Sequence, residues 1–173
     1  MQQLILPSEA LSSFKAPTDG YIEETNNSFD RFHSFKVGDI GMLIDETQFC
    51  EIIDDSNICK IPLTPKWFKG ILNLRGNSVP IVNLNEYYQI DRSSRNRRSK
   101  SHILAIGKGK GLCGIEIQNL PSKVSFNKSN IIKRKVSLPE NMNEQIECIY
   151  ETDGIWVKID TKTYFERIFS PFR

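Results

Sequence analysis

The stretch Ile61-Pro-Leu-Thr-Pro-Lys-Trp-Phe-Lys-Gly-Ile-Leu-Asn-Leu-Arg-Gly-Asn-Ser-Val-Pro-Ile-Val-Asn-Leu84 decides the fold of this 173-residue chain. Its second half contains two short apolar segments that meet at Arg75 and Gly76, the pattern of two β-strands joined by a tight turn. A turn centred on Gly76 and Asn77 would place Pro80, which has no N–H, where the ladder needs a donor. A turn centred on Arg75 and Gly76 avoids this conflict and gives Gly76 the positive φ angle. We therefore expect the second register.

This register predicts two features of the hairpin. The apolar residues that it places on one face, toward a core, are Leu72, Leu74, Val79 and Ile81. Arg75 stands at the apex, where its permanently charged guanidinium is a fork of donors on a stiff support. A side chain presented in this way suits contact with another protein better than bond chemistry.

The same residues carry a family resemblance. The sequence Ile-Pro-x-x-Pro at 61–65, followed by Lys69-Gly-Ile-Leu-Asn-Leu-Arg-Gly76 and Val79-Pro-Ile-Val-Asn-Leu84, resembles the CheW-like coupling domain of bacterial chemosensory arrays. Upstream, Phe49-Cys-Glu-Ile-Ile53 matches the valine-x-glutamate-isoleucine segment that is usual in this family. The central motif is long and specific, and the resemblance extends over about residues 32–169.

Two further features bear on the resemblance. Trp67 in this spacing, and the closing Trp156 with Tyr164 and Phe165, are most similar to the PilI-type adaptors of twitching motility. One position departs from the family pattern, because Asn83 stands where the family usually has aspartate. A role that depends on that negative charge is not expected in this chain.

The resemblance implies a mainly β fold of two packed five-stranded SH3-like β-barrels (CheW-like), with a hydrophobic seam between them, a short C-terminal helix and an N-terminal arm. It implies a non-enzymatic cytoplasmic scaffold that joins the tip of a methyl-accepting chemoreceptor to the regulatory domain of a CheA-like histidine kinase. In a PilI-like system the output is type IV pilus twitching motility. The expected partner-binding residues are Arg75, Gly70, Phe49, Glu51, Asn73 and Gly76.

Aromatic residues near the motif allow two interpretations each. Phe49 and Glu51 fall on the same side of a strand, where they form either an exposed binding patch or a buried ring with a carboxylate at its rim. Trp67 and Phe68 lie between two prolines and a glycine, where a large ring either fills the seam between the lobes or forms an interface hot spot. One of the two rings is expected in the core, and the sequence does not identify which. The sequence does not distinguish between these alternatives.

Composition independently favours an ordinary soluble protein of a reducing cytoplasm. The length suits one domain or two small lobes, and the net charge of +2 gives no general attraction to nucleic acid or membrane. The first residues lack the features of a signal peptide, and no apolar run is long enough to span a bilayer, so we expect no membrane insertion. Four cysteines without CxxC spacing (Cys50, Cys59, Cys113 and Cys148) indicate free thiols and no zinc site.

Turn residues divide the chain into an N-terminal extension (1–30), with at most a short helix around 8–14, and a CheW-like domain (31–173). Within the domain we expect lobe one at about 31–90, a basic joint at 91–100, lobe two at about 101–160 and a closing helix at about 161–169. The expected strands are 32–37, 40–45, 47–54, the central hairpin, 102–107, 112–117, 123–126, 131–136, 146–151 and 155–160. We also expect a helical turn at 66–69, a short helix at 84–88 and a type I′ turn at Asp153-Gly154.

No set of residues assembles an active site, so no enzyme, cofactor or metal is expected. His33 and His102 each open a strand without a nucleophile or ligand set nearby in the sequence. The glycines near Lys108 lack the spacing of a phosphate-binding loop, and the pair Asp54-Asp55 lacks the further oxygen ligands that calcium needs. Glu116 alternates with isoleucines on a strand and is expected to face solvent.

The basic joint supports an alternative function. Its cations, Arg92, Arg95, Arg97, Arg98 and Lys100, make a small-barrel RNA-binding module conceivable. RNA-binding barrels add exposed aromatics for base stacking, whereas the aromatics here mostly fall at core-like strand positions. The scaffold is therefore the first interpretation, and binding of nucleic acid is not expected.

Overall fold

The computed structural model describes residues 29–54, 57–90 and 101–170. Its strands are β1 (Phe29–Val37), β2 (Ile40–Asp45), β3 (Cys50–Ile53), β4 (Phe68–Leu74), β5 (Asn77–Val82), β6 (His102–Ile106), β7 (Cys113–Ile117), β8 (Ser122–Asn127), β9 (Ile131–Ile132), β10 (Ile146–Glu151) and β11 (Ile155–Ile159). The helices are α2 (Leu84–Tyr87) and α3 (Thr161–Ile168), with short 3-10 turns η1 (Gly109–Gly111), η2 (Lys128–Asn130) and η3 (Asn143–Gln145). The prediction of a mainly β chain that ends in a short helix is confirmed. The helix expected at 8–14 and the basic joint at 91–100 lie outside the described residues.

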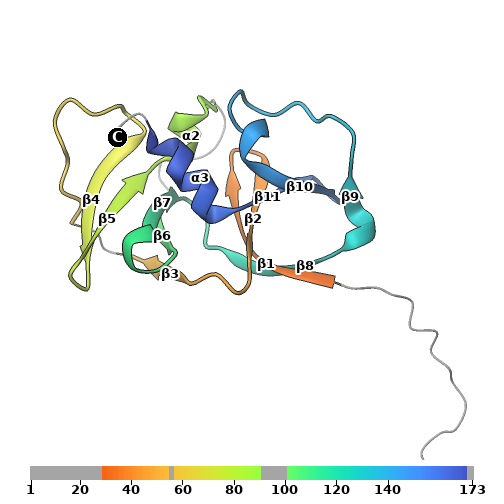
Figure 1. Cartoon of the computed structure of the whole chain (residues 1–173), viewed down its shortest axis with the longest axis horizontal. Coiled ribbons are helices and arrows are strands. Elements are labelled where there is room, and N and C mark those ends of the chain that lie inside the picture. The colour runs from red at the N-terminus through yellow and green to blue at the C-terminus, as the bar shows by residue number, and fades with distance from the viewer. Residues whose placement is uncertain (1–28, 55–56, 91–100, 171–173) are drawn as a thin grey trace, which may run out of the picture.

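The strands form two sheets that lie side by side, with α3 between them (Figure 1). One sheet has six strands in the order β8-β1-β2-β11-β10-β9, where five were expected, and the other has five in the order β3-β6-β7-β5-β4. Each sheet takes strands from both sides of residues 91–100, so the expected lobe boundaries at 31–90 and 101–160 are wrong. The cause is four pairings between segments far apart in the sequence: β2 with β11 and β5 with β7 are parallel, and β1 with β8 and β3 with β6 are antiparallel.

Apolar residues form one cluster inside each sheet and a larger one between the sheets. The cluster of the five-stranded sheet contains Leu72, Val79, Ile81, Ile103, Ala105 and Leu112, and Leu74 packs against it. The cluster of the six-stranded sheet contains Phe32, Leu43, Phe126 and Tyr150. The largest cluster joins both sheets to α2 and α3, and includes Tyr164, Phe165 and Ile168 on one face of α3. The predicted hydrophobic seam and amphipathic closing helix are therefore confirmed.

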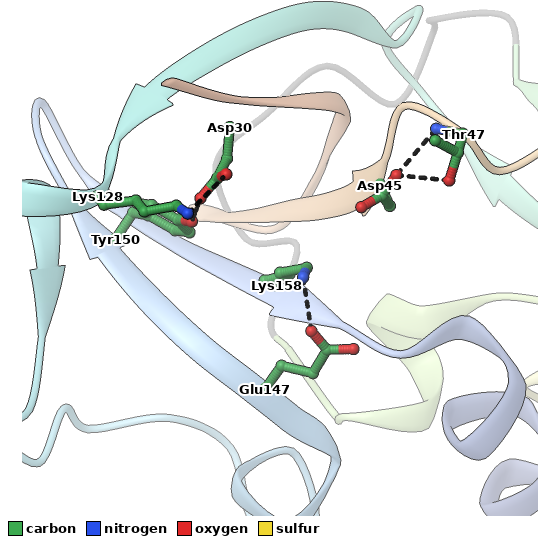
Figure 2. A network of polar contacts seen from close by, with 7 residues as sticks. All are labelled: Asp30, Asp45, Thr47, Lys128, Glu147, Tyr150 and Lys158. Atoms are coloured by element: carbon green, nitrogen blue, oxygen red, sulfur yellow. Dashed lines mark hydrogen bonds and ion pairs between the residues drawn. The ribbon is translucent and has the colours of Figure 1, made fainter. Parts of the chain in front are cut away.

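Polar contacts show that the six-stranded sheet is strongly curled (Figure 2). The hydroxyl of Tyr150 on β10 donates to Asp30 Oδ2 on β1 at 3.0 Å, although β2 and β11 lie between these strands in the sheet. Lys128 Nζ lies 3.8 Å from the other oxygen of Asp30. Because the two strands meet across the interior, the sheet must wrap around its own cluster, as in a small barrel.

Four local expectations are wrong. β3 begins at Cys50 and not at 47, because Asp45 Oδ1 accepts hydrogen bonds from the Thr47 amide (2.9 Å) and hydroxyl (2.6 Å). These bonds also lower the pKa of Asp45. In place of the helical turn expected at 66–69 there is one tight turn, in which the Phe68 amide donates to the Pro65 carbonyl, and β4 begins at Phe68. The strand expected at 131–136 is limited to β9. Between β10 and β11 the loop has three residues, because Glu151 pairs with Ile155, so the turn is not type I′.

Candidate functional site

The β4–β5 hairpin has the predicted register. Leu74 pairs with Asn77, so Arg75 and Gly76 are the two central residues of the turn, with φ angles of +52° and +82°. Two positive φ angles are the mark of a type I′ turn, whose twist matches that of the flanking strands. Asn73 Oδ1 accepts a hydrogen bond from the Gly76 amide at 2.9 Å and braces the turn. The hairpin therefore holds its apex in one conformation.

Arg75 lies at this apex with 72 % of its side chain exposed. Its Nη2 is 2.6 Å from Glu51 Oε1 on β3. β3 and β4 are the opposite edges of the five-stranded sheet, so this ion pair forms only because the sheet curls. The contact uses one end of the guanidinium and leaves the other donors directed to solvent. The structure thus brings together two of the expected site residues, Arg75 and Glu51.

The Glu51 carboxylate is only half satisfied. Its Oε1 accepts from Arg75, whereas its Oε2 is buried and has no hydrogen-bond partner among the described residues. Phe49, just before β3, is 38 % exposed, and Lys108 Nζ lies 5.8 Å from its ring centroid. Of the two interpretations for this pair, the buried phenylalanine is therefore excluded. The Phe49 ring is therefore exposed just before the edge strand β3, two residues ahead of Glu51, which pairs with Arg75.

Gly70 permits a close backbone approach, but the approaching segment belongs to this chain. Gly70 is buried with φ at +130°, and a Cβ there would lie 2.3 Å from the Cys59 carbonyl oxygen. Cys59 exchanges two backbone hydrogen bonds with Ile71, at 2.8 and 2.9 Å, and so covers the outer edge of β4. In the isolated chain Gly70 therefore supports the hairpin.

A groove of about 860 Å³ lies beside the hairpin. One wall is the turn and β5, a second is the segment 106–113, and the third is α3 with its N-cap residue, Asp160. Apolar side chains in it include Pro80, Leu112, Phe165 and Phe169, and charged ones include Lys108, Asp160, Lys162 and Glu166. Gly76 also lines the groove, and Arg75 is its neighbour in the turn. Sequence reasoning missed this groove, because its walls meet only in the fold.

Asn83 performs two tasks that both use its amide. It is 1 % exposed, and its Oδ1 accepts from the Glu86 amide at 3.0 Å, which caps α2. Its Nδ2 donates to Glu116 Oε2 at 2.6 Å. The expectation that Glu116 simply faces solvent is wrong, because this carboxylate is partly buried against Asn83. Aspartate, usual at this position in the family, can make the cap but cannot donate the second bond.

Trp67 and Phe68 are both half-buried and both pack against the seam. The Trp67 ring lies 5.2 Å from Tyr87 on α2, and the Phe68 ring lies 6.3 Å from Phe169 beyond α3, both in edge-on geometry. Both rings therefore contribute to the core, where the sequence left open which one would. They connect the start of β4 to the two helices.

The described residues contain no cluster of three or more His, Cys, Asp or Glu that would hold a metal ion. His102 Nδ1 lies 2.6 Å from Asp54 Oδ1 at the surface. Burial raises the pKa of Cys50 to about 11 and also raises the pKa of Cys113 and Cys148, so these thiols are poor nucleophiles. In the part of the chain that the structure covers, every helix is too short or too polar to cross a bilayer.

Two curled sheets with an exposed guanidinium, an exposed ring and an open groove define a small β-barrel protein with surfaces for contact. A family profile described as "CheW-like domain" matches residues 31–169. The chain is 24 % identical to the chemotaxis protein CheW of Helicobacter pylori over 129 residues, which are 75 % of this chain and 77 % of that protein. It also superposes on the crystal structure of the scaffolding protein TtCheW from Thermoanaerobacter tengcongensis, with a TM-score of 0.64 and 23 % identity, over 80 % of this chain and 94 % of that one.

The chain therefore belongs to the CheW-like domain family. Members of this family are scaffold proteins in chemotaxis signalling and have no enzymatic activity, so this chain is not an enzyme.

Proposed function

We propose that this chain is a cytoplasmic scaffold that couples the cytoplasmic tip of a methyl-accepting chemoreceptor to the regulatory domain of a CheA-like histidine kinase. The observation that carries the proposal is the placement of Arg75 at the braced apex of a hairpin whose turn and second strand line a groove. A groove with apolar walls and a charged rim suits a helical tip that has one apolar and one polar face. The Arg75 donors that Glu51 leaves unused supply polar contacts beside it.

The proposed mechanism is positional. A scaffold that holds two partners in fixed register raises the effective concentration of each for the other, and it needs no chemistry of its own. A rigid turn at the contact point serves this task, because less conformational entropy is lost on binding. The braced type I′ turn and the ion pair with Glu51 together present Arg75 in one orientation.

We further propose that the output of this system is type IV pilus twitching motility. The pattern of Trp67 and Trp156, most similar to PilI-type adaptors, supports this assignment. Deletion of the gene is expected to abolish twitching, and restoration requires a chain with Arg75. A strain that lacks the gene and twitches normally contradicts this output but leaves the scaffold role open to the binding test below.

The binding test compares two exposed arginines that both pair with a glutamate. Arg75→Ala is expected to weaken binding to a receptor cytoplasmic fragment by about tenfold or more, as for a central arginine of an interface. Arg134→Ala is the matched control, because Arg134 is 60 % exposed and pairs with Glu151 on the other sheet. Circular dichroism and size-exclusion chromatography establish that both variants fold. Equal binding by the two variants would remove Arg75 from the site.

A further inference from the structure

Leu63 is presented to solvent in a conformation that leucine disfavours. Its relative exposure is 106 %, and its φ angle is +62°, in the left-handed region. Pro62 precedes it, in the order that a type II turn requires, with proline second and a positive φ third. That third position normally takes glycine or asparagine, because a Cβ there is crowded by the backbone. We call residues 60–66 the Leu63 loop.

Two hydrogen bonds hold the Leu63 loop even though its apolar residues are exposed. Thr64 Oγ1 donates to the Ile61 carbonyl oxygen at 2.8 Å across the turn, and Pro65 accepts from the Phe68 amide at 3.0 Å. Ile61 is also exposed, at 40 %. A fixed, strained and solvent-exposed leucine gives no stability to the chain itself, whereas it is ready to enter a pocket on another protein.

The charges beside the Leu63 loop indicate the chemistry of that pocket. Lys60 and Lys66 flank the apolar tip, and both are exposed. The surface that complements them is an apolar socket with carboxylates at its rim. A second copy of this chain fits poorly in a symmetric contact, because the lysines of both copies would oppose each other.

The Leu63 loop lies at the opposite end of β4 from Arg75. β4 has seven residues, which at about 3.3 Å each separate its ends by roughly 20 Å. Figure 1 shows the segment before β4 looping out at the end of the hairpin away from the β4–β5 turn. Two proteins can therefore contact the two ends of this hairpin at the same time.

We propose that the Leu63 loop is a second docking surface, which inserts Leu63 into an apolar socket with carboxylates at its rim. The socket belongs to the kinase regulatory domain, the partner that Arg75 does not hold. This inference rests on the proposed scaffold function, and it explains how one small barrel keeps two partners apart and in register. The substitution Leu63→Gly distinguishes a contact role of Leu63 from a structural role. Glycine relieves the backbone strain and removes the side chain, so a contact role predicts weaker binding without a loss of stability. A structural role predicts a loss of stability.

The test uses the full chain with a receptor cytoplasmic fragment and a kinase regulatory domain as separate probes in calorimetric titrations. Leu63→Gly and the double change Lys60→Glu with Lys66→Glu are each expected to weaken binding of the kinase regulatory domain by about tenfold. Neither change is expected to affect binding of the receptor fragment, which Arg75→Ala weakens. The melting temperature of Leu63→Gly is expected to equal or exceed that of the wild type. Leu120→Ala, at a leucine 60 % exposed elsewhere, is the matched control and leaves both affinities unchanged.

Three outcomes overturn the proposal and differ from one another. If the wild type binds both probes and Leu63→Gly binds both equally well, the docking surface is wrong and the scaffold stands. If the wild type binds neither probe, the scaffold function and this surface fail together. If the substitutions instead abolish sedimentation with phosphatidylcholine–phosphatidylglycerol vesicles, the loop contacts a membrane and not a protein.

Discussion

A chain of three buried polar groups fixes α3, one wall of the groove, against α2. Tyr88 Oη lies 2.8 Å from Tyr164 Oη and 3.0 Å from Gln145 Oε1. Tyr88 has a single proton, and the glutamine oxygen can only accept. Both contacts are satisfied when Tyr164 donates to Tyr88 and Tyr88 donates to Gln145. This direction predicts that the two tyrosines differ in their effect on stability.

Tyr164→Phe removes the first donor and leaves Tyr88 bonded to Gln145. We expect a loss of about 0.5–1.5 kcal/mol, the net value of one hydrogen bond. Tyr88→Phe instead leaves the hydroxyl of Tyr164, which is fully buried, and the oxygen of Gln145 without partners. At about 1–3 kcal/mol for each unpaired group, the expected loss is about 2–6 kcal/mol. The double variant is expected to lose less than the sum, because it removes one of the orphaned groups.

Urea unfolding followed by circular dichroism measures the three free energies, and the slope of each transition shows whether the comparison is valid. Equal losses for the two single variants, or a larger loss for Tyr164→Phe, would refute the proposed direction of the chain. Affinity for the receptor fragment provides a second readout. If α3 forms a wall of the binding groove, Tyr88→Phe weakens this affinity under conditions in which the variant is still folded.

Further predictions concern pH, the capping asparagine and the covered edge of β4. Burial raises the pKa of Tyr150 above the value of about 10 of an unfolded tyrosine. Its contribution to the free energy of unfolding is therefore complete below about pH 10 and is lost as the pH rises above this value. Tyr150→Phe is expected to make the free energy of unfolding less dependent on pH in this alkaline range, as measured by urea unfolding. Asn83→Asp loses the donor to Glu116 and opposes two carboxylates, at a cost of about 1–3 kcal/mol in urea unfolding, and adding Glu116→Gln restores most of it. Gly70→Ala meets the Cys59 carbonyl and is expected to cost about 2–4 kcal/mol, and a melting temperature equal to that of the wild type would contradict this packing.

The hairpin was predictable from sequence because its constraints are local. Pro80 cannot donate and Gly76 accepts a positive φ angle, and these two facts select one register from two. The apical position of Arg75 follows directly from that register. The amphipathic helix α3 was predictable for the same reason, since its apolar spacing lies within nine residues of sequence.

The partners of these elements were not predictable, because they depend on pairings between distant segments. No local signal indicates that β2 lies parallel to β11, or that the sheet curls far enough for Glu51 to reach Arg75. The groove and the bond between Asn83 and Glu116 follow from the same long-range arrangement. Tight turns such as Gly38-Asp39 favour pairing of successive strands, which led to the incorrect lobe boundaries.

The interleaved order of the strands has a consequence for synthesis. β1 and β2 leave the ribosome before the other described strands, whereas β11, the neighbour of β2 in the six-stranded sheet, leaves it after all of them. Until then an edge of β2 is unpaired, and such an edge is prone to association with other chains. A gene cut between the codons for 90 and 101 should thus yield two insoluble pieces, which regain solubility only when they are produced together.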